Sequence, residues 1–472
     1  MDKLIDYQGS PTALLVDFIL KVGFQDLPPD VVEKTKQLTL DTTGAALGGY
    51  LTDLGAICLG IVTSLGGNPE STIIGSGRKT SCANAAFVNA KLANALDYDD
   101  VFFNAAHFCS PTVAAALAVG ERVKASGKDV LTAIALGYDA TARVGISCIQ
   151  PRIALSFAWH TIGSIVASAK LLGLDKQEML NALGIGCANA PLTCLWKSWP
   201  ETMVKYGDMG VMAYQGILSA LLAQMGHTGS KDILEGDYGF WRYIGAEKCD
   251  YNILLSELGK KWYIMDSSIK PYPACRWIHA SLDLFAKIVK ENNLKPEDIE
   301  KVVVRVHRTA VEKGSIYEPK DWLTAQVSIP YNIALVAFRI TPSSEWQTPE
   351  RYKNPEILSF HRKVEVEEDP DAARIISSAE QPTYGFKRAS TSLEVVTASR
   401  SFKARAEYAK GDPWLPETKM SDEELRDKFR SLASRVAESS LRWRNTIEEI
   451  IEKVHNMEKM DDVSELMPLL AP

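Results

Sequence analysis

Acidic side chains gather just before a histidine in the stretch NALDYDDVFFNAAHFCSP, residues 94–111. Asp97, Asp99 and Asp100 lie within four positions of one another, and His107 follows them. Imidazole has an ordinary pKa of about 6.5, so it can both accept and donate a proton near neutral pH. This stretch is therefore the first candidate for proton-transfer chemistry.

Two other histidines also lie in distinctive local contexts. His160 is in SFAWHTIGS and His279 is in KPYPACRWIH, out of 7 histidines in the chain. Each of the three, His107 included, could act as a general acid or base, or could equally be a packed core or cap residue. Metal binding is a further alternative, but the sequence has no H-E-x-x-H motif and no histidine pair at helical spacing.

Cationic side chains lie near the same segments. Lys205 is in WPETMVKYGDMG, and SIKPYPACRWIH carries Lys270, Arg276 and His279. Lysine and arginine that converge in a cleft hold carboxylates through charge-assisted hydrogen bonds. Most lysines and arginines are surface charges, which is the alternative here, but the apolar, proline-bearing context IKPYPAC is less typical of a solvated charge run. The pattern therefore indicates a site for carboxylates.

The chain carries none of the common signatures of nucleotide binding or of serine-triad hydrolysis. It lacks G-x-G-x-x-G, G-x-x-x-x-G-K-[ST] and G-x-S-x-G, and GSGRKT fits none of them. The 8 cysteines form no C-x-x-C pair and no zinc spacing, so we expect reduced, buried thiols. Cys109 and Cys275 lie inside motifs of interest, so a nucleophilic role for either is the alternative. The best enzymatic interpretation is acid–base chemistry with no cofactor and no metal.

The composition is that of a globular protein that folds throughout its length. The chain has 472 residues, of which 46% are hydrophobic and 24% charged. The formal net charge of -7 and the pI near 5.7 exclude a global positive field, so no nucleic-acid partner is expected. The beginning, MDKLIDYQGS, has no apolar signal core, and no unbroken apolar run of about 18 residues occurs. We therefore expect a cytoplasmic protein with no membrane partner.

Helical patterns dominate the first part of the chain. PTALLVDFILKVGF is amphipathic, and LPPDVVEKTKQLTLDTTGAALGG has prolines at its start and glycines at its end, as helices often do. SPTVAAALAVGERVKASG, DVLTAIALGYDATARVG and MGVMAYQGILSALLAQMG are rich in small residues, which let helices approach closely. Near the C-terminus, Ser421 and Glu424 have the spacing of a capping box at the start of another helix.

Alternating patterns appear later in the chain. IEKVVVRVHRTAV, HRKVEVEED and TSLEVVTASRSFKARAEY predict strands of a small antiparallel sheet, and AQVSIPYNIALVAFRI predicts a helix packed beside it. We therefore predict a mainly α fold. A large all-helical domain would be formed by residues 1–266 and 411–472, with a smaller α+β lid domain, residues 267–410, inserted between them.

The chain resembles the MmgE/PrpD family, which contains 2-methylcitrate dehydratases, cis-aconitate decarboxylases and iminodisuccinate epimerases. The segments that carry the resemblance span nearly the whole chain: LPPDVVEKTKQLTLDTTGAALGG, NAKLANALDYDD with the following His107, WHTIGS, MVKYGDMG, IKPYPACRWIH, AQVSIPY and KGDPWLPETKMSDEELRDKF. The resemblance implies a large helical domain, a smaller α+β lid, a homodimer and an active site between the domains. Members share the scaffold and differ in the proton or leaving group that they handle.

The resemblance also implies a role for each motif residue. Implied to be catalytic are His107, His160, Lys205, Tyr331 and Asp97. Implied to bind substrate are Lys270, Arg276, His279 and Ser328. The aspartates would then hold and tune His107 in a cleft, because a carboxylate partner favours the imidazolium ion and fixes the tautomer.

The chain departs from the family pattern near His107. Val101 stands where many members have threonine, and Phe108 and Cys109 stand where proline and serine or glycine are common. Asn-Ala at residues 89–90 replaces a frequent Asn-Gly. The missing hydroxyl and the aromatic neighbours make this corner more apolar, so the substrate could differ from 2-methylcitrate and cis-aconitate.

We expect a carbon–oxygen lyase: a cofactor-independent dehydratase, similar to 2-methylcitrate dehydratase, that acts on a small hydroxy-di- or tricarboxylate. His107 or His160 would remove a proton, the cationic side chains would stabilise the negative charge that forms, and Tyr331 or the second histidine would protonate the departing hydroxyl. Decarboxylation of a cis-aconitate-like substrate and epimerisation of an iminodisuccinate-like substrate stay open. So does another class of protein, a non-catalytic dimeric carboxylate-binding protein.

Overall fold

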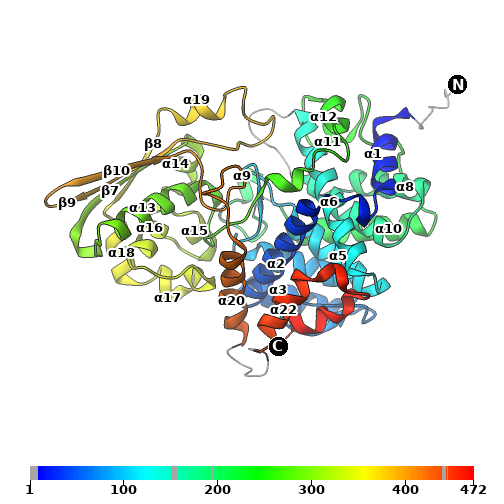
Figure 1. The fold of residues 1–472 in the computed structure, drawn as a ribbon, viewed down its shortest axis with the longest axis horizontal. Helices are drawn as coiled ribbons and strands as arrows, with labels where there is room; N and C mark the ends of the chain where they lie inside the picture. Colours follow the sequence, from blue (N-terminus) through cyan, green and yellow to red (C-terminus); the bar gives the residue numbers. More distant parts are fainter. Residues whose placement is uncertain are drawn as a thin grey trace.

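The chain folds into a mainly α-helical molecule, as predicted. The computed structural model describes residues 9–149, 157–192, 195–205, 207–437, 443 and 445–471. Helices from both ends of the sequence lie together in a larger helical part, and residues 267–410, called the α+β part below, lie beside it (Figure 1).

The helical part contains a helix over each segment that was predicted to be helical, together with further helices that were not predicted individually. The helices are α1 (Pro11–Lys21), α2 (Pro29–Tyr50), α3 (Asp53–Leu65), α4 (Cys82–Ala95), α5 (Cys109–Val123), α6 (Gly127–Ser147), α7 (Thr161–Leu171), α8 (Lys176–Ala188), α9 (Leu195–Ser198), α10 (Met209–Gln224), α11 (Phe240–Tyr243), α12 (Tyr251–Leu255), α20 (Asp422–Ala437) and α22 (Thr446–His455). The predicted proline start of α2 is present, with Pro29 in its first turn. The predicted capping box of α20 is also present, because the backbone N–H groups of Ser421 and Glu424 each donate to the other's side chain.

Small residues bring the central helices of the helical part into close contact, as their composition predicts. A Cβ atom on Gly137 of α6 would lie 2.6 Å from the carbonyl oxygen of Gly163 in α7. A Cβ atom on Gly163 would lie 2.1 Å from Oγ1 of Thr112 in α5. Both distances are shorter than side chains tolerate, so only glycine permits these crossings.

The α+β part contains a four-stranded sheet in the order β10-β9-β7-β8. Its elements are η5 (Arg276–Ile278), α13 (His279–Glu291), β7 (Ile299–Val306), α14 (Arg308–Gly314), α15 (Trp322–Val327), α16 (Ile329–Ala337), η7 (Ser344–Gln347), α17 (Pro349–Tyr352), α18 (Pro355–His361), β8 (Val364–Glu368), α19 (Ala372–Ile376), β9 (Thr391–Thr397) and β10 (Ser401–Ala406). Helices α13 and α16 cover one face of the sheet (Figure 1).

Two details of the α+β part differ from the prediction. The sheet is mixed and not antiparallel, because the helices α14 to α18 form a long crossover that returns the chain parallel to β7 as β8. The predicted single helix is two helices, which meet at Ser328. Its hydroxyl accepts the N–H of Tyr331 and so starts α16, and Pro330 has no N–H with which to continue α15.

The helical part also contains short strands beside its helices. The two-residue strands are β1 (Ser71–Thr72), β2 (Lys79–Thr80), β3 (Val101–Phe102), β4 (Cys148–Ile149) and β5 (Lys248–Cys249), and β6 (Ser267–Ser268) lies at the start of the α+β part. Pairing of β3 with β6 brings the acidic stretch beside the segment that leads to Lys270.

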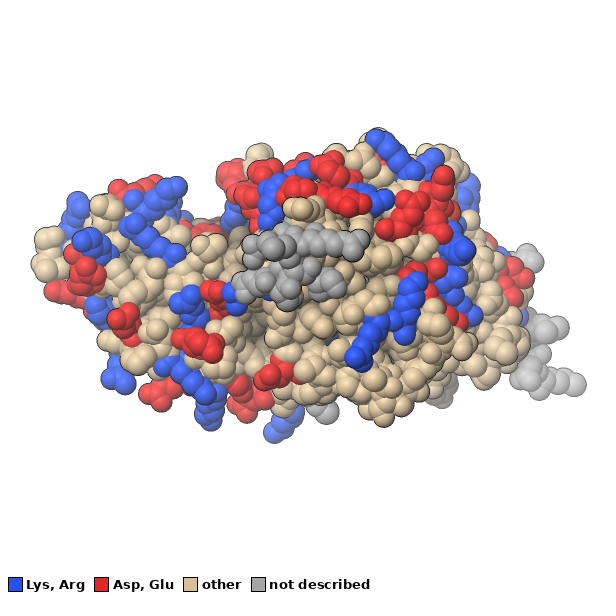
Figure 2. All heavy atoms as spheres, turned by 90° about the horizontal axis from the view of Figure 1, so that it is seen from below, with Lys and Arg blue, Asp and Glu red and all other residues tan. Residues whose placement is uncertain are grey.

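Lysine, arginine, aspartate and glutamate side chains all lie on the surface of the molecule (Figure 2). Basic and acidic side chains lie side by side on the face seen from below (Figure 2). Within the described residues, no single helix combines the length and apolar composition of a bilayer span. Helices α2 and α3 meet that test only when taken together, and they are bent by 88° relative to each other.

Gly49 offers a test of the contact between α2 and α4. A Cβ atom there would lie 2.0 Å from the carbonyl oxygen of Leu92, so Gly49→Ala must push the two helices apart. We expect a loss of about 1–3 kcal/mol or more in the free energy of unfolding, seen as a lower thermal midpoint.

Gly60→Ala in α3 is the matched control. Nothing lies within 4 Å of its Cβ position, so this change should leave the midpoint unchanged or raise it by the equivalent of about 0.5–1 kcal/mol. Equal midpoints for the two variants would contradict the packing argument.

Candidate active site

The candidate site is built on the C-terminal end of α4. Asp97 follows the helix directly and has a φ angle of 52°, and Lys205, which faces it, has a φ angle of 54°. Left-handed backbone is uncommon outside glycine and tends to occur at functional sites. The turn at Asp97 directs the acidic stretch back toward α5.

Two buried ammonium groups lie beside the carboxylate of Asp97. Lys270 Nζ is 2.7 Å from Asp97 Oδ1, and Lys205 Nζ is 4.0 Å from the same oxygen. Burial alone would raise the pKa of Asp97, but the charges of Lys270, Lys205 and His107 outweigh it and hold that pKa below its ordinary value. Burial lowers the pKa of Lys205, against the attraction of Asp97. The carboxylate is therefore ionised at neutral pH.

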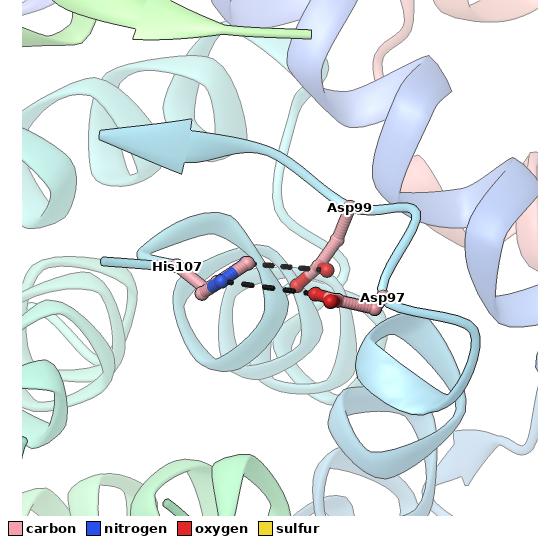
Figure 3. A group of neighbouring side chains, drawn as sticks. All are labelled: Asp97, Asp99 and His107. Atoms are coloured by element: carbon pink, nitrogen blue, oxygen red, sulfur yellow. Dashed lines mark ion pairs between the residues drawn. The ribbon is translucent and has the colours of Figure 1, made fainter. Parts of the chain in front are cut away.

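His107 faces the carboxylates of two aspartates (Figure 3). Its Nε2 is 3.9 Å from Asp97 Oδ1, and its Nδ1 is 3.3 Å from Asp99 Oδ1. Asp99 also accepts hydrogen bonds from Asn94 Nδ2 at 2.9 Å and from the Ser110 hydroxyl. Burial opposes ionisation of Asp99, yet the charge and hydrogen bond of His107 lower its pKa to about 2. A protonated imidazole would therefore have a carboxylate at each nitrogen.

The same three residues also have the spacing of a metal site. The ligand-type atoms of Asp97, Asp99 and His107 lie within 4.8 Å of one another. However, Asp97 already accepts the ammonium of Lys270, so the protein provides its own cation at this carboxylate. The set of donors therefore favours an ammonium–carboxylate–imidazole group.

The side chain of His160 binds the backbone of His107. Its Nδ1 is 2.8 Å from the carbonyl oxygen of Phe157, which can only accept, so Nδ1 carries the proton. Its Nε2 then accepts the backbone N–H of His107 at 3.2 Å. Burial, reinforced by the charge of His107, lowers the pKa of His160 to about 3. His160 is therefore a neutral imidazole that holds the backbone of His107.

Asp100 has a different role from the other two aspartates. Its carboxylate accepts the backbone N–H of Cys109 at 3.0 Å and the hydroxyls of Tyr138 and Ser267 at 3.3 and 3.2 Å. Burial, followed by the charge of Asp99, raises its pKa to about 6. Asp100 therefore ties the start of α5 to α6 and to β6, and it does not pair with the histidine.

Five successive carbonyl groups accept hydrogen bonds from buried side chains: those of residues 94 and 95 at the end of α4 and those of residues 96–98, which follow it. The donors, in order, are Lys205, Gln326, Gln347, Lys270 and Lys428, at distances of 2.6–2.8 Å. The last carbonyls of a helix have no partner within the helix and carry partial negative charge, so they attract cations and amides. We call residues 94–98 with these five donors the α4 cap.

Three members of the α4 cap were not predicted as site residues from the sequence. Gln326 lies in the AQVSIPY segment, and its polar side chain in an otherwise apolar run was a signal that could have identified it. Lys428 is also in a family segment, and its ammonium pairs with Asp41 Oδ1 at 2.5 Å. For Gln347 the sequence offers no comparable signal.

Arg276 and His279 lie next to Lys270 in the fold but bind other parts of the protein. Arg276 pairs with Asp412 at 2.6 Å and donates to the carbonyl oxygen of Lys410 at 2.8 Å. The two ring nitrogens of His279 lie 3.1 Å from Arg276 and 3.0 Å from the carbonyl oxygen of Ala274. Burial and then the charge of Arg276 put the pKa of His279 well below its ordinary value. Substrate contact by either residue stays a prediction.

Tyr331 and Ser328 lie inside the α+β part. The hydroxyl of Tyr331 donates to the carbonyl oxygen of Trp346, and the hydroxyl of Ser328 donates to that of Ile316. Burial raises the pKa of Tyr331. Among the described residues, no hydrogen bond or ion pair that we find joins these side chains to Asp97. Their catalytic and binding roles stay predictions.

Comparison with known proteins matches both parts of the chain to domains of the same family. The MmgE/PrpD N-terminal domain matches residues 13–250, and the MmgE/PrpD C-terminal domain matches residues 272–454. A cis-aconitate decarboxylase of Aspergillus terreus is 26% identical over 491 residues, which cover 97% of this chain and 95% of that protein. A cis-aconitate decarboxylase of Homo sapiens is 27% identical over 476 residues, covering 96% and 92%. The similarity therefore extends over nearly the full length of each relative.

The carboxyl group of Asp100 should make stability fall as pH rises. Because its pKa is raised from 3.8 to about 6 on folding, its contribution is complete below about pH 4 and is lost as pH rises through about 6. The variant Asp100→Asn keeps a side-chain oxygen that can accept the backbone N–H of Cys109, but its side chain does not ionise. We expect its free energy of unfolding, relative to the wild type, to rise by up to about 3 kcal/mol between pH 4 and 7.

Urea unfolding at several pH values measures this difference, and Asp99→Asn is the matched control. The pKa of Asp99 is lowered to about 2, so its carboxylate stabilises the fold above about pH 4, and its loss should destabilise the protein across that range. A difference between Asp100→Asn and wild type that does not change with pH would contradict the assignment.

Proposed function

The chain belongs to the MmgE/PrpD family, and we propose that it is a cofactor-independent lyase that decarboxylates a small cis-aconitate-like tricarboxylate. The observation that carries the proposal is the position of His107 next to the carboxylates of Asp97 and Asp99, with two buried ammonium groups beside Asp97. The decarboxylase relatives, which match more than nine-tenths of each chain, support the reaction type.

The ammonium groups would bind the substrate and stabilise its charge. A tricarboxylate brings several negative charges, and the loss of carbon dioxide leaves further electron density on the remaining carbon skeleton. Lys205 and Lys270 place fixed positive charge in a buried region, where such charge acts strongly because it is little screened by water. To bind a substrate carboxylate, the ammonium groups of both side chains would have to give up part of their present contacts with Asp97 and with the carbonyl groups of the α4 cap.

His107 would then supply a proton to carbon. The bond to the departing carboxylate breaks, its electron pair enters the unsaturated skeleton, and the imidazolium of His107 protonates the carbon that gains the pair. A carboxylate lies near each ring nitrogen of His107. Asp97 and Asp99 would hold the ring in place, and His160 would hold its backbone.

Dehydration of a 2-methylcitrate-like substrate is the second candidate. It needs a base for the carbon-bound proton and an acid for the departing hydroxyl. The lowered pKa of Lys205 favours this reaction, because an amine that loses its proton more easily can act as the base while His107 acts as the acid. Phe108 adjoins His107 in the chain and packs against Phe102, and both buried rings are compatible with a substrate that carries a methyl group.

Access to His107 requires part of the molecule to move. Its side chain is 7% exposed and that of Lys270 is 1% exposed. The α+β part supplies Lys270, Gln326 and Gln347 to the α4 cap, so displacement of this part would open the site, as expected of a lid. A homodimer and a cytoplasmic location stay predictions.

Turnover in D2O followed by NMR tests the reaction. With cis-aconitate, we expect carbon dioxide to form and one deuterium to appear on the product carbon that His107 protonates. Loss of water from 2-methylcitrate would favour dehydration, and deuterium exchange with inversion of a stereocentre would favour epimerisation. Binding of a polycarboxylate without any turnover would support the non-catalytic binding protein instead.

Substitution of His107 and Asp97 tests the residue roles. His107→Gln should lower kcat by about 10²–10⁴-fold, because it removes a proton-transfer group. Asp97→Asn should also lower kcat, and asparagine tolerates the left-handed backbone at this position. His227→Gln is the matched control, because His227 is exposed, and it should retain full activity. Full activity of His107→Gln on the true substrate would refute the mechanism.

A further inference from the structure

Two cysteines outside the candidate site face each other across a short pair of strands. Strand β4 follows α6, and it pairs antiparallel with β5 so that Cys148 and Cys249 are direct partners. The backbone N–H of Asp250 donates to the carbonyl oxygen of Ser147 at 2.8 Å, next to this pair. Cys148 and Cys249 are therefore a non-hydrogen-bonded pair, whose side chains point to the same face and whose Cα atoms are typically about 4.5 Å apart.

This geometry suits a disulfide bond. Disulfides join cysteines whose Cα atoms are about 4.4–6.8 Å apart, so the pair could close without a large movement of the backbone. Both residues are free thiols in the structure. Among the described cysteines, no other two are strand partners.

The two thiols have unequal surroundings. Cys148 is buried, whereas Cys249 is only partly buried and lies 3.6 Å from the hydroxyl oxygen of Ser147. A hydrogen bond between the thiols lowers the pKa of Cys249 and raises that of Cys148. A partly exposed thiol with a lowered pKa attacks external disulfides most readily, and a buried neighbour can then displace the adduct.

We propose that Cys148 and Cys249 form a redox-active dithiol site that closes to a disulfide by exchange with a small-molecule disulfide such as oxidised glutathione. The thiolate of Cys249 attacks one sulfur of that disulfide, forms a mixed disulfide and releases one thiolate. The sulfur of Cys148 then gives up its proton, attacks Sγ of Cys249 and expels the second thiolate. The protein loses two hydrogen atoms, and the small disulfide is reduced to two thiols.

The dithiol is separate from the candidate active site but close to a contact between the two parts of the molecule. The carbonyl oxygen of Ile146, two residues before Cys148, accepts the hydroxyl of Thr383 from the α+β part at 2.6 Å. Neither cysteine has a described contact with Asp97 or His107. The inference therefore does not rest on the proposed function.

Mass spectrometry of the full-length protein tests the inference. The reduced protein is equilibrated with mixtures of reduced and oxidised glutathione, quenched in acid, alkylated and digested. We expect a peptide containing Cys148 to be cross-linked to a peptide containing Cys249, an intact mass lower by two hydrogen atoms, and reversal by dithiothreitol. This measurement uses the wild-type chain, so it does not depend on whether a variant folds.

Serine variants identify the order of attack. Cys148→Ser should stop at a mixed disulfide between glutathione and Cys249, whereas Cys249→Ser should not react at Cys148 because that thiol is buried. Cys82→Ser removes a buried cysteine that has no cysteine as strand partner, so it should form the same cross-link as the wild type. A wild-type protein that carries only glutathione on Cys249, or that forms no cross-link at any glutathione ratio, would overturn the proposal.

Discussion

The arrangement of this molecule depends on the need to satisfy the carbonyl groups at the buried end of α4. A helix leaves its last carbonyls without internal partners, and a buried polar group without a hydrogen bond costs about 1–3 kcal/mol. Residues 94–98 are buried, so side chains must supply the hydrogen bonds. The donors come from the segment before α10, from the α+β part and from α20. The end of α4 is therefore complete only when the segment before α10, helix α20 and the α+β part are all in place.

The same donors also determine the electrostatics of the candidate site. Lys205, Lys270 and Lys428 bring positive charge to the α4 cap, and the carboxylates of Asp97, Asp99 and Asp41 lie against them. Buried charges are tolerated when each is paired and hydrogen-bonded, and the removal of one partner is strongly destabilising. The pairing holds the ammonium groups and His107 in place before any substrate arrives. Such preorganisation is what a site needs in order to stabilise charge that forms during a reaction.

Features of the fold that depend only on residues close together in the sequence could be predicted. The capping box before α20 and the proline at the start of α2 act through neighbouring residues, so the sequence is enough to identify them. The direction of β8 could not be predicted in this way. An alternating strand has the same pattern whether it runs parallel or antiparallel to its neighbour, and here the helical crossover decided the direction.

For the candidate site, the sequence by itself determined which chemistry was available: three aspartates before a histidine, and lysines in apolar segments that resemble a family. Only the tertiary structure decided which of those groups contact one another. Asp97 and Asp99 face His107, whereas Asp100 points to Tyr138 and Ser267. The two lysines beside Asp97 lie more than a hundred positions away in the sequence, so the positive charge around this carboxylate is a property of the packed chain and not of its neighbours in sequence.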